Sequence, residues 1–154
     1  MEDEEKPKDE KVTHIPENAN IQVNNISFRY TGGLEPVLKD LSLEIPANKT
    51  TAIVGVSGSG KTTLMKLLLG FYEVDKGEIM MTNFNLKNIS QKEWRRNCGV
   101  VMQEGYIFND TIAKNIAVGE DYVDKEKLAH AINVANISDY IDGLPLGFNT
   151  KIGS

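Results

Sequence analysis

A glycine-rich stretch in the first half of the chain combines residue types that suit the binding of phosphate groups. It runs Gly55-Val56-Ser57-Gly58-Ser59-Gly60-Lys61-Thr62 and satisfies the pattern G-x-x-x-x-G-K-[ST]. Glycines permit positive φ, so successive backbone N–H groups can turn towards a polyanion. The lysine offers its ammonium to the β- and γ-phosphates of a nucleotide, and the threonine offers its hydroxyl to a bridging Mg²⁺. The stretch therefore predicts a phosphate-binding loop.

The segments on either side of the loop predict the elements that position it. Residues 52–54 are apolar without alternation, which is typical of a strand buried on both faces of a parallel sheet. Beyond the loop, apolar residues recur at helical spacing, namely Leu64, Leu67, Leu68 and Phe71. Gly70 predicts the end of this helix. Its start near Gly60 would add free amide donors and the positive end of a helix dipole.

These features predict the residues of a nucleotide site. Lys61 is the candidate catalytic cation, Thr62 the candidate Mg²⁺ ligand, and Thr63 is expected on the α-phosphate side. The candidate nucleotide-binding residues of the loop are Gly55, Ser57, Gly58, Ser59, Gly60, Lys61, Thr62 and Thr63. A plain glycine-rich turn with a surface lysine is the alternative. It would leave the small residues inside the loop and the strand–loop–helix context unexplained.

Alternation of apolar and polar residues predicts further strands around the loop. Residues 26–30 and 41–45 both alternate, which indicates an antiparallel β unit ahead of the loop. After the first helix, a turn is predicted at Asp75-Lys76-Gly77, followed by a strand with Ile79 and Met81 on one face. Residues 99–102 form another short apolar run, interpreted as a strand.

Helix-start signals occur at three places after residue 88. Ser90 and Glu93 fit a capping box, and Ile89 and Trp94 occupy the positions of a hydrophobic staple. A second helix is predicted to begin near Asn109 or Asp110. The third begins near Asp124 and carries one apolar face, consisting of Leu128, Ala131, Ile132 and Ala135.

Composition narrows the class of protein. The formal net charge of -5 and the pI near 5.1 argue against a nucleic-acid partner, because phosphate-backbone affinity depends on clustered Lys and Arg. No apolar stretch approaches the roughly 18 residues of a membrane-spanning helix. The single cysteine, Cys98, favours a reducing compartment. Residues 1–19 are rich in charge, proline and asparagine and predict a disordered linker.

Several segments together resemble the nucleotide-binding domain of ATP-binding-cassette (ABC) transporters. "GVSGSGKTT" is similar to the family's Walker A loop, and the resemblance continues through "VNNISFRY", "VLKDLSLEIP", "LLLGFYEVDKGEI" and "GVVMQEGYIFNDTIAKNI". The order and spacing most resemble half-transporter exporters of bacteriocins, peptides or lipids. The resemblance implies an α/β fold for residues 20–154, a partial P-loop NTPase core with an N-terminal antiparallel β subdomain. It would include the Walker A loop, the Q-loop and the start of the helical subdomain.

The resemblance also implies roles for residues outside the loop. Tyr30 matches the aromatic residue on which adenine stacks, and Gln103 matches the catalytic Q-loop glutamine that contacts Mg²⁺ and the attacking water. Residues 106–108 match the apolar surface that docks a coupling helix, although core packing would also account for them. The implied cofactors are ATP and Mg²⁺. The implied partners are a second nucleotide-binding domain and an exporter's transmembrane domain, at the cytoplasmic face of the membrane.

The chain departs from the family pattern in two places. Val56 stands where the family often has proline. The sequence also ends before the family's signature motif, Walker B aspartate, catalytic glutamate and switch histidine. We expect the intact parent to hydrolyse ATP, and the chain itself to be soluble, to bind nucleotide at most and not to hydrolyse it. We also expect open β edges at residues 50–54 and 98–102.

Two other functions fit part of the sequence. One is a stand-alone nucleotide-sensing or interaction module, and the other is a small P-loop kinase. A reading frame that continues past Ser154 into a signature motif would separate the ATPase from the sensor. The segment after Gln103 has no arginine-rich lid, which disfavours the kinase.

Overall fold

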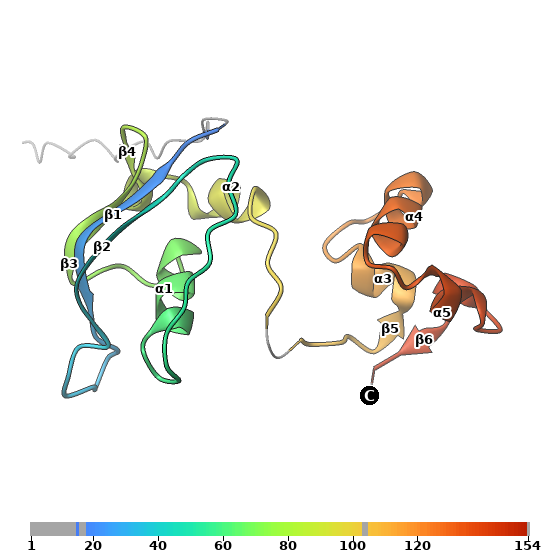
Figure 1. Cartoon of the computed structure of the whole chain (residues 1–154). Helices are drawn as coiled ribbons and strands as arrows, with labels where there is room; N and C mark the ends of the chain where they lie inside the picture. The colour runs from blue at the N-terminus through green and yellow to red at the C-terminus, as the bar shows by residue number, and fades with distance from the viewer. Residues whose placement is uncertain (1–14, 16–17, 103–104, 154) are drawn as a thin grey trace, which may run out of the picture. The chain divides into compact units, whose positions relative to one another are not determined.

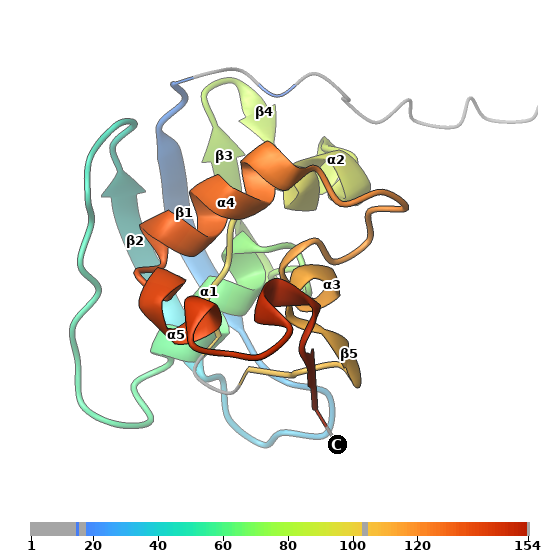
Figure 2. The same ribbon diagram turned by 90° about the vertical axis from the view of Figure 1, so that its right-hand side faces the viewer.

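The computed structural model describes residue 15 and residues 18–102 and 105–153 (Figure 1). They divide into two compact units, Met1–Val100 and Val101–Ser154. The first unit contains an antiparallel sheet with the strand order β2-β1-β3-β4, whose strands lie side by side in Figure 2. Its strands are β1 (Ile21–Phe28), β2 (Leu38–Ile45), β3 (Lys76–Met81) and β4 (Phe84–Asn85).

The alternating patterns ahead of the loop are confirmed as strands, although β1 ends at Phe28 and leaves Arg29 and Tyr30 of the predicted run outside it. β1 and β2 form the predicted antiparallel pair, and β3 buries Ile79 and Met81 on one face. The turn predicted at residues 75–77 is wrong in its extent, since β3 already begins at Lys76. Lys76 is held in the ladder because it lies opposite Ser27 of β1.

An irregularity in the middle of β1 keeps its apolar side chains on one face. Val23 and Ile26 are both buried although they are three residues apart, and the pairing with β2 shifts between them. The backbone N–H of Asn25 donates to Ser42 Oγ over 2.9 Å, and Ser42 Oγ donates to Asn25 Oδ1 over 2.8 Å. On β3, a Cβ at Gly77 would collide with the carbonyl oxygens of Asn24 and Asn25. The bulge is therefore held from both neighbouring strands.

The predicted helix after the glycine-rich loop is confirmed as α1 (Lys61–Leu68). It packs on the sheet through an apolar cluster formed by Val23, Ile26, Phe28, Leu38, Leu64, Leu67, Leu68 and Ile79. The stop predicted at Gly70 is confirmed just past the helix end: the Gly70 N–H donates to Leu67 O and the Phe71 N–H to Lys66 O, which is a Schellman motif. Phe71 lies beyond the helix and is 49% exposed, so its predicted place on the apolar face is wrong.

The helix predicted after Ser90 is α2 (Gln91–Arg96), which follows the short 3-10 helix η1 (Leu86–Asn88). Ile89 and Trp94 are buried in one cluster with Met81, as the predicted staple requires. Ser90 occupies the N-cap but makes no capping hydrogen bond through its side chain, so the capping-box prediction is wrong in that respect. Glu93 instead pairs with Arg96 at 3.5 Å.

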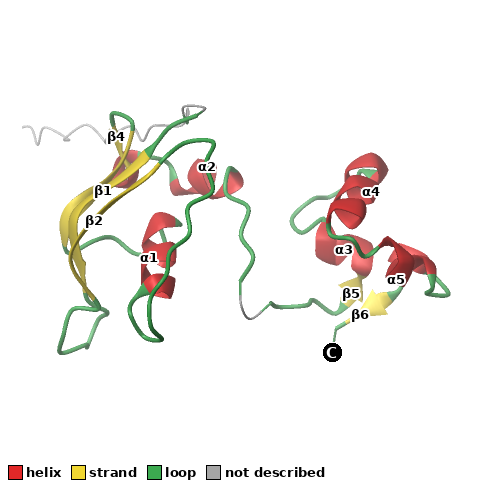
Figure 3. Ribbon diagram, viewed as in Figure 1, coloured by secondary structure: helices red, strands yellow, loops and turns green. Residues whose placement is uncertain are grey.

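Two predicted strands are not formed. Residues 52–54 and 99–102 are drawn as loop in Figure 3, and neither run has a strand partner among the described residues. Val54 is 88% exposed and Val101 is 101% exposed, whereas Ile53 still packs against the sheet cluster. An apolar run forms a strand only where a neighbouring strand makes hydrogen bonds with its backbone.

The second unit is small and mainly helical. Two-residue strands β5 (Asp110–Thr111) and β6 (Lys151–Ile152) pair with each other. The helices are α3 (Ile112–Ile116), α4 (Lys125–Val134), α5 (Ser138–Asp142) and the 3-10 helix η2 (Gly147–Asn149). The apolar core of the unit consists of Ile112, Ala113, Leu128, Ile132 and Ile141. Across both units, no helix within the described ranges has the length and apolar content to cross a bilayer.

The two helix starts predicted in this unit agree with the structure to different degrees. The helix predicted to begin near Asp124 is confirmed as α4, and Asp124 caps it by accepting hydrogen bonds from the amides of Glu126 and Lys127. The helix predicted to start near Asn109 or Asp110 is α3, which begins slightly later, because residues 110–111 pair with β6 and the side chain of Thr111 provides the cap. On α4, Leu128 and Ile132 are buried, Ala131 is half-buried and Ala135 lies exposed beyond the helix end.

Candidate functional site

The predicted phosphate loop curls around the side chain of Lys61. The ammonium donates to the carbonyl oxygens of Gly55 over 2.9 Å and Val56 over 2.7 Å, and it lies 3.4 Å from Ser59 Oγ. The Ser59 N–H donates to Val56 O over 3.2 Å and closes a turn. The exposed residues Ser57 and Gly58 lie within that turn. The structure therefore brings Lys61 together with both ends of the loop.

Gly60 joins the loop to α1 in a conformation that favours glycine. Its φ is 91°, and a Cβ at this position would come within 2.6 Å of Leu38 Cδ2 and 3.3 Å of the Val37 carbonyl oxygen. The missing side chain thus lets the N-terminus of α1 lie against the start of β2. This close approach fixes the point from which Lys61 and Thr62 leave the loop.

The N-terminus of α1 has the chemistry of an anion site. No side chain caps it and its first turn carries no acidic residue. The first amides of a helix have no partner within the helix, so they and the positive end of the helix dipole face the loop. Thr62 is exposed next to Lys61, and a Cβ at Gly58 would meet open space. Amide donors and the Lys61 ammonium meet here, with Thr62 next in the chain, which fits a phosphate chain with its metal ion.

Tyr30 lies beside the first turn of α1. Its hydroxyl is 3.1 Å from Thr63 Oγ1, and Thr63 is only 6% exposed. The Tyr30 ring meets Phe28 at 5.0 Å and Tyr72 at 5.3 Å between centroids, both edge to face. The sequence does not predict Tyr72 as part of this group, because it follows the end of α1 and belongs to no periodic pattern.

The other candidate residues belong to the second unit. Gln103 lies outside the described residues. Tyr106, Ile107 and Phe108 are 80%, 56% and 49% exposed, so they are not core residues of this unit. The side chain of Asn115 holds the segment in place, since it accepts from the Phe108 N–H over 2.7 Å and donates to the Phe108 carbonyl over 2.9 Å.

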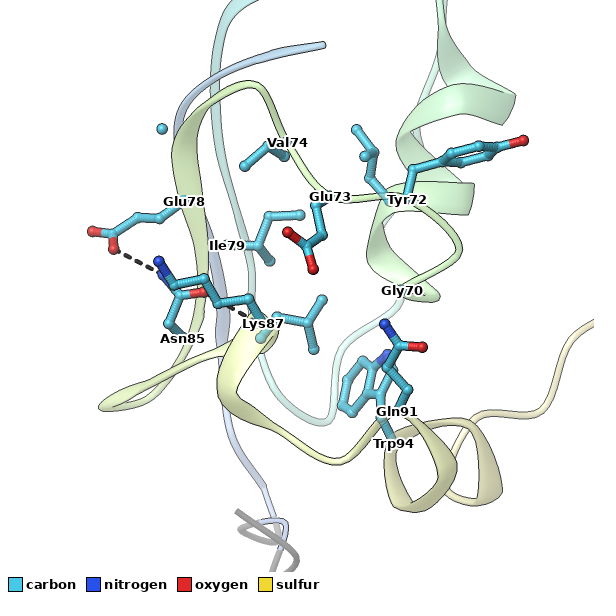
Figure 4. A pocket seen from close by; sticks show the side chains of 13 residues that line it. Gly70, Tyr72, Glu73, Val74, Glu78, Ile79, Asn85, Lys87, Gln91 and Trp94 are labelled. Atoms are coloured by element: carbon cyan, nitrogen blue, oxygen red, sulfur yellow. Dashed lines mark hydrogen bonds between the residues drawn. The ribbon is translucent and has the colours of Figure 1, made fainter. Parts of the chain in front are cut away.

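A separate hollow of about 170 Å³ lies between the end of α1, β3 and α2 (Figure 4). Buried side chains of Leu67, Ile79 and Trp94 contribute to its lining, along with the exposed residues Glu73 and Lys87. None of the predicted phosphate-binding residues lines it. The convergent donors of the phosphate loop, rather than this hollow, therefore define the candidate site.

Comparisons with known proteins relate the chain to ABC transporters. A family profile described as "ABC transporter" matches residues 38–149. The chain is 40% identical over 139 residues to an ATP-dependent lipid A-core flippase of Haemophilus influenzae, covering 90% of this chain and 24% of that protein. It is 37% identical over 133 residues to a putative multidrug export ATP-binding/permease protein of Staphylococcus aureus, covering 86% of this chain and 23% of that protein.

The structural comparison gives a similar result. A bacterial Atm1-family ABC exporter solved with ATP bound matches with a TM-score of 0.83 and 34% sequence identity. The match covers 93% of this chain and 26% of the exporter chain. The chain thus spans about a quarter of the length of the relatives it matches.

Proposed function

Because the chain belongs to the ABC transporter family, we propose that it is the ATP-binding part of an exporter's ATPase. The observation that carries the proposal is the loop that folds around Lys61 and opens onto the uncapped N-terminus of α1. The flippase and multidrug-export names of the relatives support export as the process that ATP drives. Residues 20–154 form the proposed ATPase portion, and residues 1–19 the linker.

In this proposal each part of the loop has a defined task. The backbone amides of the loop and of the α1 N-terminus bind the phosphate oxygens, and Lys61 neutralises the β- and γ-phosphates. Thr62 and Gln103 hold Mg²⁺, which supplies further neutralisation of phosphate charge. Thr63 contacts the α-phosphate side, and the Tyr30 ring supports the adenine.

The proposed partners follow from the same assignment. A second nucleotide-binding domain faces this one across the nucleotide, and an exporter's transmembrane domain docks on the exposed residues Tyr106, Ile107 and Phe108. Exposed aromatic and aliphatic side chains of this kind favour a protein partner. The assembly would lie at the cytoplasmic face of the membrane.

Calorimetric titration of the complete polypeptide that carries this sequence with MgATP tests the proposal. Replacing Lys61 with alanine removes a charge-assisted contact and should weaken binding about tenfold or more. Lys66→Ala is the matched control, because Lys66 is the lysine in the last turn of the same helix, away from the loop. Absence of MgATP binding by the parent protein, or equal losses in the two variants, would contradict the proposal.

The metal assignment has its own test. Thr62→Val keeps the shape of the side chain and removes the hydroxyl. We expect the affinity for ATP in the parent to rise on addition of Mg²⁺, and this rise to shrink in the valine variant, while ATP binding without metal stays similar. An undiminished response to Mg²⁺ in the variant would exclude Thr62 as a ligand.

A further inference from the structure

Two hydroxyl groups meet where the end of β1 approaches α1. Tyr30 Oη and Thr63 Oγ1 are 3.1 Å apart, and either atom can donate. Thr63 is 6% exposed and Tyr30 is half-buried, so water competes little for the Thr63 hydroxyl. The two residues lie far apart in the sequence, and this contact ties the segment after β1 to the first turn of the phosphate-loop helix.

The Tyr30 ring is fixed independently of this contact. Phe28 and Tyr72 pack edge to face against it, with interplanar angles of 82° and 90°. Aromatic pairs in this geometry stabilise each other, so the two contacts favour this placement of the Tyr30 ring. The Tyr30 hydroxyl is therefore held at a defined point, to which a residue on α1 can be anchored.

Thr63 has the capacity to bind two groups at once. A hydroxyl carries one hydrogen to donate and two lone pairs to accept. If Tyr30 donates to Thr63, the hydrogen of Thr63 remains available for an acceptor at the N-terminus of α1. The contact would then both orient that hydrogen and hold the turn from which Lys61 and Thr62 extend.

We infer that the Tyr30 hydroxyl is a positioning group for triphosphate binding and acts through Thr63. This role is separate from any contact that the Tyr30 ring makes with a base, and it rests on the proposed function. In this inference the Tyr30 hydroxyl serves the triphosphate chain of the ligand, and the Tyr30 ring serves its base. The hydroxyl contributes to binding of any triphosphate chain, whereas the ring contributes only where a base is present.

The two roles separate when MgATP is compared with magnesium tripolyphosphate, which has no base. In the complete polypeptide, Tyr30→Phe keeps the ring and removes the hydroxyl. We expect binding of both ligands to weaken by the same factor, about two- to tenfold. Tyr30→Ala should weaken MgATP binding further than tripolyphosphate binding.

A double variant tests whether Tyr30 acts through Thr63. In a Thr63→Val background, Tyr30→Phe should cause no additional loss, because the acceptor of its hydrogen bond is gone. Thr63→Ser should restore the sensitivity to Tyr30→Phe. Unchanged tripolyphosphate binding in Tyr30→Phe, or losses that multiply in the double variant, would overturn the inference.

Tyr72→Phe is the matched control. It removes a hydroxyl from the same aromatic group, and it should bind both ligands as the parent does. A loss equal to that of Tyr30→Phe would show a general effect of the cluster and would overturn the inference. If the parent protein binds neither ligand, the proposed function fails and this inference fails with it.

Discussion

The indole nitrogen of Trp94 donates to the backbone carbonyl of Leu68 over 2.7 Å, which links α2 to the last turn of α1. The backbone N–H groups of Gly70 and Phe71 donate to the preceding carbonyl oxygens of Leu67 and Lys66, respectively. The C-terminal carbonyls of a helix otherwise lack partners. The carbonyl oxygens at the C-terminal end of α1 thus accept hydrogen bonds from other groups of the protein, whereas no side chain caps the N-terminal end.

Trp94→Phe should destabilise the first unit by about 1–3 kcal/mol, because it leaves a buried carbonyl without its donor. Denaturant unfolding followed by circular dichroism measures this, since the variant removes the only tryptophan of the chain. Arg95→Ala changes the neighbouring residue, which is exposed, and should cost less than about 0.5 kcal/mol. A phenylalanine variant as stable as the parent would contradict the structural role of the indole N–H.

Gly60→Ala should destabilise the junction of loop and helix more than Gly58→Ala does. Both positions have positive φ, which costs an alanine about 1–2 kcal/mol. At Gly60 the added Cβ also meets Leu38 and the Val37 carbonyl, whereas at Gly58 it meets open space. Thermal unfolding of the two variants gives the comparison. Equal destabilisation would mean that the approach of α1 to β2 does not depend on Gly60.

Asp124→Ala should lower the stability of α4 by about 0.5–2 kcal/mol, because the carboxylate caps the first amides of that helix. Hydrogen exchange at the amides of Glu126 and Lys127 is the direct measurement, since both donate to Asp124 Oδ1. Asp124→Asn retains a capping oxygen and should exchange nearly as slowly as the parent. Fast exchange in the asparagine variant would show that charge, not the hydrogen bond, stabilises the helix.

Cys98 should react slowly with alkylating reagents at neutral pH. Burial raises the pKa of the Cys98 thiol, because a low-dielectric environment disfavours the thiolate, which is the reactive form. The alkylation rate should therefore keep rising with pH past the ordinary thiol pKa of about 8.5. Addition of denaturant should remove this difference. A rate that levels off at or below the ordinary value would contradict the burial of Cys98.

The sequence predicts the parts of this structure that depend on local interactions. The glycine pattern before Lys61, the spacing of leucines in α1 and the helix start near Asp124 each involve residues within a few positions, and the structure contains all three features. Strands at residues 52–54 and 99–102 are predicted from apolar runs but are absent. A strand depends on a neighbour that the run itself does not encode.

Part of the candidate site also depends on contacts between distant segments. The Tyr30–Thr63 contact joins a residue before β2 in the sequence to a residue after it. Tyr72, which follows α1 in the sequence, contacts the Tyr30 ring. Nothing in the local pattern at either position indicates its partner. The loop pattern predicts Thr63 and the resemblance predicts Tyr30, as separate nucleotide contacts, and only the fold reveals that they touch.

The bulge at Asn25 makes residues on three strands interdependent. A graft of β1 into another protein would need Ser42 and Gly77 as well, since the first bonds to Asn25 and the second leaves room for its carbonyl. Without them the strand would revert to regular alternation, and Asn25 in place of Ile26 would share the face of Val23. Designers of chimeric domains should therefore treat Asn25, Ser42 and Gly77 as one transferable module.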